Sequence, residues 1–253
     1  MSASGPTGLP RTDGVTLPPT WLLHGGRPTC RWLIRRRFDV RVHGAEHVPA
    51  SGPVVVAANH VGVIDGPLMA IFAPRPVHAL TKLEMFEGRL GRFLRWSGQV
   101  PLDRLHTDPR AVRTTVAVLR RGGAVGIFPE GTRGAGELDV FHRGAAYLAM
   151  VTGAPVVPVM MFGTREPGGS SSSLPRKGAV IDLVFCRPFA VDATPWPRTR
   201  DDVAEVSRRL RERMLTDLEE SIQATGRSLP GPIPAAKDDQ EPDPGGGVTE
   251  ISA

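Results

Sequence analysis

Residues 54–65 read Val-Val-Val-Ala-Ala-Asn-His-Val-Gly-Val-Ile-Asp, and this stretch decides the predicted fold. The apolar run 54–58 is typical of a strand. Gly66 and Pro67 follow, and the segment after them has a helical pattern. The chain therefore turns from a strand into a helix here, with an Asn-His pair and an Asp at the junction.

The same alternation continues on both sides of this stretch. Short apolar or β-branched runs predict further strands near residues 77–81, 99–102, 124–128, 156–162 and 179–185. Asp108-Pro109 is typical of a capped helix start and Gly122-Gly123 of a helix end. Apolar residues three and four apart predict a last helix over about 201–224. Strands that alternate with helices predict an α/β fold, here a mixed, mostly parallel sheet with covering helices.

Length and composition limit the class of protein. The chain has 253 residues and a mass of 27.2 kDa, which suits one enzyme-sized domain. Hydrophobic residues make up 40% and charged residues 23%, so neither a fibrous nor a wholly disordered chain fits. The net charge is +5, and only three of the 31 Lys and Arg residues are lysines. Because arginine binds phosphate and carboxylate groups bidentately, we expect acidic partners. Two cysteines are too few for a disulfide framework and favour the cytosol.

The chain divides into four segments. Residues 1–20 are rich in Gly, Pro, Ser and Thr and residues 227–253 in Gly, Pro and acidic residues, so we expect both ends to be disordered. Residues 21–38 place tryptophans and leucines beside five arginines, which suits the interface of an anionic membrane or a helix packed on its own domain. Residues 39–226 form the expected folded domain. No apolar run of spanning length and no secretory signal pattern occurs, so we expect peripheral attachment to the inner, cytoplasmic face of the membrane.

His60 and Asp65 are the first candidate catalytic residues. Positions five apart point to opposite faces of a strand and lie about 140° apart on a helix, so the two side chains meet only across a turn, which Gly62 permits. A carboxylate paired with an imidazole fixes its tautomer and leaves the other ring nitrogen to take a proton from an alcohol. The alternative is that Asp65 caps the helix and His60 packs at the strand end.

Two further motifs follow predicted strands, at the end where α/β sheets bind ligands. Residues 128–133 read Phe-Pro-Glu-Gly-Thr-Arg. In this motif Gly131 allows the backbone to approach a ligand closely, and Arg133 can bind a phosphate. Glu130 can orient that arginine or accept a hydrogen bond from a glycerol hydroxyl. Arg104 follows another predicted strand and is a second candidate phosphate ligand. A surface turn with a salt bridge is the alternative for either motif.

Together these blocks resemble the 1-acylglycerol-3-phosphate (lysophosphatidic acid) acyltransferase family of glycerolipid acyltransferases. That family is marked by N-H-x-x-x-x-D, a strand motif that ends in Arg, F-P-E-G-T-R, and an apolar strand that contains proline. All four blocks occur here in that order, at residues 59–65, 98–104, 128–133 and 156–160. The segment 81–86, which contains Lys82 and Glu84, also looks like a flanking family segment. The resemblance covers roughly residues 39–190 and makes 39–226 the predicted acyltransferase domain. His142 is a minor departure, at a position where relatives carry another polar residue.

The resemblance implies transfer of a fatty acyl group from a thioester, acyl-CoA or acyl-ACP, to the free hydroxyl of 1-acylglycerol-3-phosphate. The product would be phosphatidic acid for phospholipid synthesis, and the resemblance implies neither a metal nor another cofactor. His60 would act as the general base, and Asp65 would hold it and balance its charge. The residues that would bind the acceptor are Arg104, Glu130, Gly131, Thr132 and Arg133. Backbone N–H groups near Gly131 are candidate oxyanion donors.

Other functions fit parts of the sequence. The same chemistry on another lysophospholipid, on glycerol 3-phosphate or on a specialised lipid is one alternative, and a catalytically silent lipid-binding protein is another. His43 and His47 have the spacing of a zinc pair on a helix, but residues 41–44 are typical of a strand and turn, which argues against a metal site. The scattered arginines lack interleaved aromatic residues, so we expect no nucleic-acid partner. The expected partners are a thioester donor, which includes acyl carrier protein, a lysophospholipid and the membrane surface.

Overall fold

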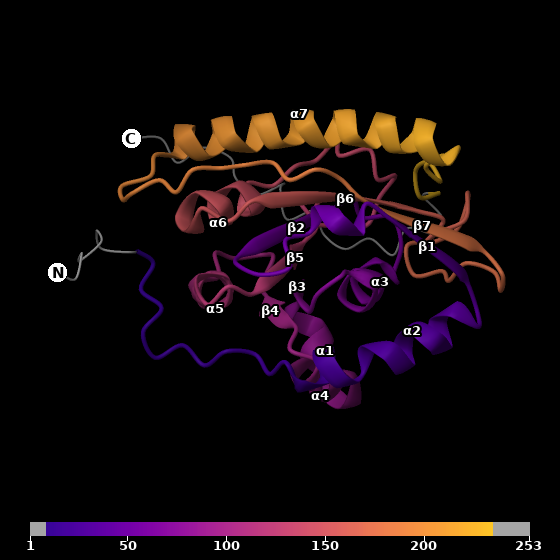
Figure 1. The fold of residues 1–253 in the computed structure, drawn as a ribbon, viewed down its shortest axis with the longest axis horizontal. Coiled ribbons are helices and arrows are strands. Elements are labelled where there is room, and N and C mark those ends of the chain that lie inside the picture. The colour runs from indigo at the N-terminus through magenta and orange to yellow at the C-terminus, as the bar shows by residue number, and fades with distance from the viewer. Residues whose placement is uncertain (1–8, 235–253) are drawn as a thin grey trace.

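The computed structural model describes residues 9–234. Its strands are β1 (Asp39–His43), β2 (Val54–Ala58), β3 (Val77–Lys82), β4 (Val100–Leu102), β5 (Ala124–Ile127), β6 (Val156–Phe162) and β7 (Val180–Phe185). They form one sheet in the spatial order β1-β7-β6-β2-β5-β3-β4 (Figure 1). All neighbouring pairs are parallel except β6 and β7, which are antiparallel. The predicted mixed, mostly parallel sheet is therefore confirmed.

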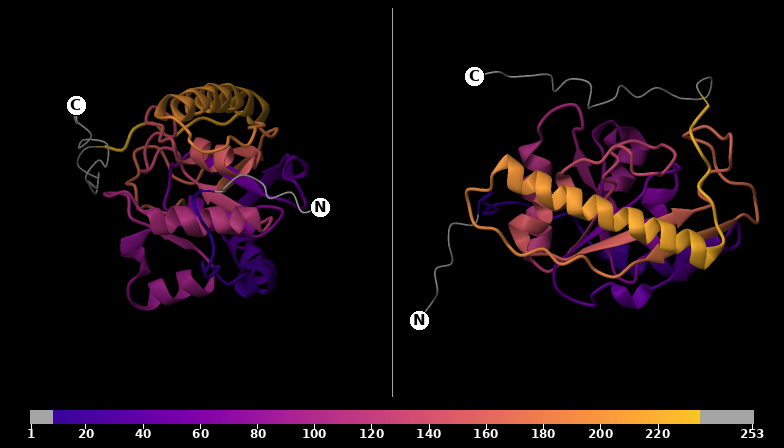
Figure 2. Two further views of the ribbon diagram at one scale, coloured as in Figure 1. Left: turned by 90° about the vertical axis from the view of Figure 1, so that its left-hand side faces the viewer. Right: turned by 90° about the horizontal axis from the view of Figure 1, so that it is seen from above.

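Helices cover both faces of this sheet. The helices are α1 (Trp21–Gly25), α2 (Arg27–Arg35), α3 (Asp65–Phe72), α4 (Gly88–Trp96), α5 (Pro109–Arg120), α6 (Gly144–Thr152) and α7 (Arg200–Thr225), with short 3-10 turns η1 (Ala45–His47) and η2 (Leu83–Phe86). Figures 1 and 2 show α7 along one side of the molecule and α1, α2 and α4 on the opposite side. The molecule is thus layered as helices, sheet and helices.

The alternation of side chains along β2 divides the core into two parts. Val54 and Val56 belong to the cluster that includes Phe72 of α3, whereas Val55 belongs to the cluster that includes Leu210 of α7. Successive residues of a strand point to opposite faces, so a strand covered on both sides needs apolar residues at every position. This requirement explains why residues 54–58, which form β2, include no polar residue.

The strand directions bring several loops to one edge of the sheet. β2, β3, β4, β5 and β6 run in one direction, and β1 and β7 run in the other. The carboxyl ends of the first group therefore lie at the same edge as the amino ends of β1 and β7. The loops 59–64, 128–143 and 163–179 follow β2, β5 and β6 at this edge. We call it the loop edge.

Most predicted elements are confirmed, and their differences from the structure have local causes. Each predicted strand agrees with the structure to within one residue at either end, and the last helix spans Arg200–Thr225. β1 is missing from the strands predicted by apolar runs because it is an edge strand with alternating exposed positions. The segment 21–38 forms two helices, since the chain breaks at Gly26 and the second helix carries a proline in its first turn.

The two ends that the sequence predicts to be disordered lie partly outside the described residues. The parts outside are residues 1–8 and 235–253. Residues 9–20 form no helix or strand. The backbone carbonyls of Pro10 and Arg11 accept hydrogen bonds from Arg120 Nη1 and Arg113 Nε of α5, each at 2.9 Å. Among residues 9–234, no helix combines the length and hydrophobicity needed to cross a bilayer.

Asn59 fixes the end of β2 against β6. Its side chain is fully buried, and Oδ1 accepts a hydrogen bond from the backbone N–H of Met161 at 2.8 Å. Nδ2 donates to the carbonyl of the same residue at 3.3 Å. This amide continues the sheet at the point where the chain leaves it, directly before His60.

We predict that Asn59→Ala lowers the free energy of unfolding by about 2 kcal/mol, because the buried N–H of Met161 then loses its acceptor. Urea denaturation followed by circular dichroism measures this change. The matched control is Thr216→Ala, which removes an exposed hydroxyl from α7. That control should stay within about 0.5 kcal/mol of the parent. Equal losses in the two variants would contradict the assigned role.

Candidate active site

His60 and Asp65 meet across the turn between β2 and α3. His60 Nδ1 lies 2.8 Å from Asp65 Oδ2, and the same oxygen accepts hydrogen bonds from the backbone N–H groups of Val61 at 2.6 Å and Gly62 at 2.8 Å. Asp65 is fully buried, and the side chain of His60 is 18% exposed. Because the carboxylate oxygen accepts from Nδ1, that nitrogen carries the hydrogen and Nε2 keeps its lone pair.

Neighbouring loops hold this turn in place. A Cβ atom at Gly62 would lie 2.5 Å from the carbonyl oxygen of Thr164, so only glycine fits there. The imidazole of His60 stacks on the ring of Phe128, with 4.0 Å between centroids. The carbonyl of His60 accepts a hydrogen bond from the N–H of Gly134 at 2.9 Å. The candidate base is therefore fixed by its own turn after β2 and by the loops that follow β5 and β6.

Glu130 belongs to the same assembly. Its side chain is buried, and Oε1 accepts a hydrogen bond from the backbone N–H of His60 at 2.7 Å. Burial raises the pKa of Glu130 to about 7, and the nearby charge of Asp65 adds to the effect. Sequence reasoning assigned Glu130 to Arg133 or to substrate, whereas the structure shows it supporting the backbone of the candidate base.

Three cations lie next to this assembly. Arg104 Nη1 donates to the carbonyl of Gly131 at 2.7 Å, and Arg133 Nη1 donates to the carbonyl of Ser171 at 2.9 Å. The third is Lys82, at the end of β3. Its pKa is lowered first by burial and then by the positive charge of Arg104, which places the two side chains close together. Sequence reasoning noticed the segment of Lys82 but gave that lysine no role.

Gly131 is required where it stands. Its φ angle is +71°, and a Cβ atom there would lie 2.7 Å from the ring of His142. Its N–H donates to the carbonyl of Phe128 at 3.0 Å, so this amide is engaged within the turn. That backbone N–H groups near Gly131 act as oxyanion donors stays a prediction. Thr132 lines a cavity of about 140 Å³ beside Glu130.

Arg165 is a residue of this region that sequence reasoning missed. It is 2% exposed, and its guanidinium donates to the carbonyls of Val61 at 3.0 Å, Gly134 at 3.0 Å and Gly231 at 2.6 Å. The arginine therefore ties together the loops after β2, β5 and β6. In the sequence Arg165 stands next to Glu166, three positions after the end of β6, and no motif marks it as a residue that joins loops.

The other candidate groups have structural partners. His43 Nε2 lies 2.8 Å from Asp182 Oδ1, and His47 Nδ1 lies 2.8 Å from the carbonyl of Phe185. Within residues 9–234, no group of three or more His, Cys, Asp or Glu side chains is arranged to hold a metal ion. Burial raises the pKa of Cys186 to about 12, so its thiol stays protonated at neutral pH.

This geometry suits general-base catalysis on an anionic substrate that carries a hydroxyl group. The Nε2 lone pair of His60 can accept a proton from an alcohol, and Asp65 balances the resulting charge. The adjacent cations Lys82, Arg104 and Arg133 can hold a phosphate group.

Comparisons with known proteins agree with this chemistry. Residues 39–162 match the family described as Acyltransferase. A 1-acyl-sn-glycerol-3-phosphate acyltransferase of Bacillus subtilis is 31% identical over 159 residues, which covers 62% of this chain and 77% of that protein. The human 1-acyl-sn-glycerol-3-phosphate acyltransferase alpha is 32% identical over 195 residues, covering 74% of this chain and 66% of the relative.

A solved structure shows the same fold. The crystal structure of the 1-acyl-sn-glycerophosphate (LPA) acyltransferase PlsC from Thermotoga maritima aligns with a TM-score of 0.58 at 24% identity, covering 78% of each chain. The chain therefore belongs to the acyltransferase family, as its motifs indicated. It is an enzyme that moves an acyl group from a donor to an acceptor.

We predict that Glu130→Gln removes part of the pH dependence of stability. With a pKa of 4.5 in the unfolded chain and about 7 in the fold, the carboxyl favours the folded state below pH 4.5, and this contribution is lost as pH rises to 7. The loss amounts to about 3 kcal/mol at most. Glutamine keeps the acceptor for the N–H of His60, so the variant should exceed the parent in stability at pH 8.

Urea denaturation of both proteins at pH 5 and pH 8 measures this difference. Glu137→Gln, which changes an exposed carboxylate of the same loop, is the matched control and should follow the parent at both pH values. A Glu130→Gln protein with the parent's pH profile would show that Glu130 is ionised throughout.

Proposed function

We propose that this acyltransferase transfers a fatty acyl group from acyl-CoA or acyl-ACP to the free hydroxyl of 1-acylglycerol-3-phosphate and yields phosphatidic acid. The observation that carries the proposal is the pairing of His60 with Asp65 beside Lys82, Arg104 and Arg133. Such a site combines a base for a hydroxyl with cations for the phosphate of the same small acceptor. The bacterial and human relatives are both named for 1-acyl-sn-glycerol-3-phosphate, which supports the choice of acceptor.

The proposed reaction proceeds without an acyl-enzyme. Nε2 of His60 takes the proton of the acceptor hydroxyl, and the hydroxyl oxygen attacks the carbonyl carbon of the thioester. The carbon–sulfur bond then breaks, and the departing thiolate takes the proton from the imidazolium. Asp65 stabilises the imidazolium and keeps Nε2 in position, while Glu130 and Arg165 hold the backbone on both sides of the base. Positioned proton abstraction contributes about 10²–10⁴-fold to the rate.

The phosphate of the acceptor orients it for this attack. We assign its binding to Arg104 and Arg133, as expected from sequence, and add Lys82. Gly131 and Thr132 give the glycerol backbone a close approach to the loop after β5. With the phosphate held beside the base, the hydroxyl on the neighbouring glycerol carbon reaches Nε2 without further rearrangement.

We predict that His60→Ala lowers thiol release by about 10²–10⁴-fold, since the acceptor hydroxyl then lacks its base. The assay follows free thiol from palmitoyl-CoA and, in parallel, from palmitoyl-ACP. The acceptors compared are lysophosphatidate, glycerol 3-phosphate and lysophosphatidylcholine. His106→Ala is the matched control, because that imidazole is 76% exposed.

The outcomes separate the candidate functions. Release that needs both His60 and lysophosphatidate supports the proposal. A preference for another acceptor would keep the mechanism and replace the substrate. Unchanged release in His60→Ala would remove the proposed base, and lipid binding without acceptor-dependent release would indicate a catalytically silent protein.

We further propose that the enzyme works while attached peripherally to the inner face of the membrane. Large apolar side chains, each more than half exposed, gather on α1, α2 and α4, and they are Trp21, Trp32, Leu33, Leu90, Phe93 and Trp96. These helices lie together on the side opposite α7 (Figures 1 and 2). Exposed arginines accompany them on α4, at positions 89, 92 and 95. Aromatic residues beside arginines suit an anionic bilayer surface.

The contribution of α4 was not foreseen from sequence. Its apolar residues recur at every third position, Leu90, Phe93 and Trp96, and so form one helix face. The spacing was visible, but the segment lies between two predicted strands and resembles a covering helix. The exposure of this helix face is evident only from the structure.

We predict that the double variant Trp32→Ser/Trp96→Ser binds vesicles of phosphatidylglycerol at least tenfold more weakly, because two aromatic side chains no longer enter the interface. Co-sedimentation at two salt concentrations measures the binding, which should also weaken with salt. The matched control is Trp196→Ser, since this tryptophan is 57% exposed in the segment before α7, away from α1, α2 and α4. An unchanged partition of the double variant, or an equal loss in the control, would contradict this surface.

A further inference from the structure

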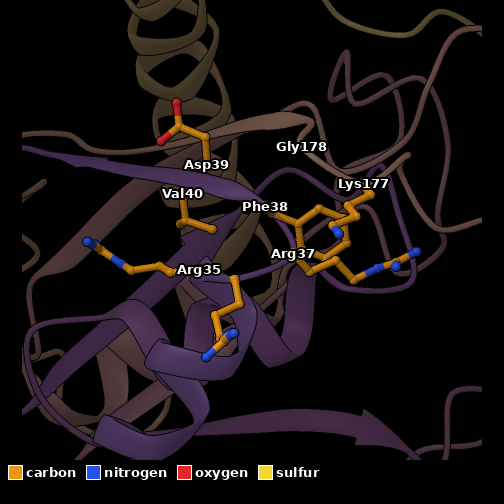
Figure 3. A pocket seen from close by; sticks show the side chains of 8 residues that line it. Arg35, Arg37, Phe38, Asp39, Val40, Lys177 and Gly178 are labelled. Carbon is orange, nitrogen blue, oxygen red and sulfur yellow. The ribbon is translucent and has the colours of Figure 1, made fainter.

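A second group of positive charges lies at the loop edge, outside the site described above. A cavity of about 670 Å³ opens between the end of α2, the start of β1 and the end of the loop 163–179 (Figure 3). Its charged lining residues are Arg35, Arg36, Arg37, Lys177 and Asp39. Four of the five are cations, so the cavity suits an anion.

These cations are not neutralised by carboxylates. Within residues 9–234, neither the three arginines nor Lys177 forms an ion pair, and the guanidinium groups lie over aromatic rings. Arg37 lies 5.3 Å from the centroid of Phe38. The acidic residue of the cavity, Asp39, is paired with Arg41 at 2.8 Å. All four cations are exposed and keep their hydrogen-bond donors for a ligand.

The reversal of β1 and β7 places the cavity at the same edge of the sheet as the candidate active site. The backbone N–H of Gly178 donates to the carbonyl of Arg37 at 2.7 Å, and that of Asp39 donates to Ala179 at 3.0 Å. These bonds fix the cavity at the point where β1 and β7 begin. His60 follows the end of β2 at the same edge of the sheet. The cations assigned to the acceptor follow β3, β4 and β5, on the other side of β2. His60 therefore lies between two groups of cations.

One loop joins the cavity to the base. Near the start of the loop 163–179, Arg165 contacts the His60 turn through the carbonyl of Val61. Near the end of the same loop, Lys177 and Gly178 line the cavity. Three strand spacings separate β2 from β1, which is about 14 Å. The pantetheine arm of a thioester carrier spans about 15 Å from its sulfur to its phosphate, at the roughly 3.5 Å per three bonds of an extended chain.

We propose that this cavity binds the phosphate at the end of the donor's pantetheine arm, a group that coenzyme A and acyl carrier protein share. With its thioester carbon at His60, the donor would extend across β6 and β7 to Arg37 and Lys177, away from the phosphate of the acceptor. The two substrates would thus approach the base from opposite sides and without competing for one set of cations. This inference rests on the proposed function, since it needs a pantetheine thioester as donor.

The test compares two donors that differ in phosphate. Palmitoyl-CoA carries the phosphates, and S-palmitoyl-pantetheine lacks them. Arg37→Gln/Lys177→Gln should lower the ratio of kcat/KM for palmitoyl-CoA to that for S-palmitoyl-pantetheine about tenfold, mainly through KM, and added salt should shrink the effect. The matched control is Arg176→Gln/Arg208→Gln, which removes two exposed charges that are paired with carboxylates outside the cavity. The control should keep the parent's ratio.

A binding measurement makes the inference independent of turnover. Titration calorimetry of free coenzyme A into the His60→Ala protein should show about tenfold weaker binding when Arg37 and Lys177 are also replaced. If the parent protein released no thiol in response to lysophosphatidate, the proposed function would be overturned. The titration would still show whether the cavity binds coenzyme A. An unchanged ratio and unchanged coenzyme A binding would overturn the inference. If the ratio and coenzyme A binding were unchanged but the Arg37→Gln/Lys177→Gln variant bound phosphatidylglycerol vesicles more weakly, the cavity would be assigned to lipid headgroups instead.

Discussion

The structure of the site depends on a single buried carboxylate oxygen. Asp65 Oδ2 accepts two backbone N–H groups and the Nδ1 hydrogen of His60. The other carboxylate oxygen, Oδ1, is buried without a hydrogen-bond partner among the described residues, so the three bonds at Oδ2 supply the hydrogen bonding that this buried carboxylate needs. Meeting three donors at one oxygen forces the chain after β2 into a tight turn, and the carbonyl of Thr164 lies so close to this turn that position 62 must be glycine. The base, its tautomer and the start of α3 are consequences of this one requirement.

Around that oxygen, the fold separates two tasks. The sheet supplies rigid strand ends, and its two apolar clusters cover both faces of β2. The ends of the strands and the loops carry the charge: the cations that we propose bind the acceptor lie at or after the ends of β3, β4 and β5, and a second basic group lies where β1 and β7 begin. The antiparallel pairing of β6 with β7 allows this arrangement, because it turns two strand beginnings toward the edge that holds the base.

Much of the fold could be read from the chain, because each buried strand of a parallel sheet is a short apolar run and most motif residues directly follow one. The pairing of His60 with Asp65 was also accessible, since only a turn joins positions five apart. Long-range partners were not accessible. Glu130 contacts the backbone of His60 and Arg165 donates to four backbone carbonyls, and backbone atoms leave no residue-specific signal in a sequence. The exposure of the apolar face of α4 could not be predicted for a related reason. The spacing of apolar residues predicts that a helix has an apolar face, but it does not show whether another element covers that face.

The hydrogen bond from the His60 N–H to Glu130 has a consequence for how such an enzyme can diverge. This bond joins the loop after β5, which we propose contacts the acceptor, to the turn that carries the proposed base, so substitutions in the two segments are not independent. A lineage that adapts its acceptor through the loop after β5 risks displacing its own base. Variation should accumulate more freely around Lys82, at the end of β3, where acceptor preference can drift while the catalytic turn stays intact.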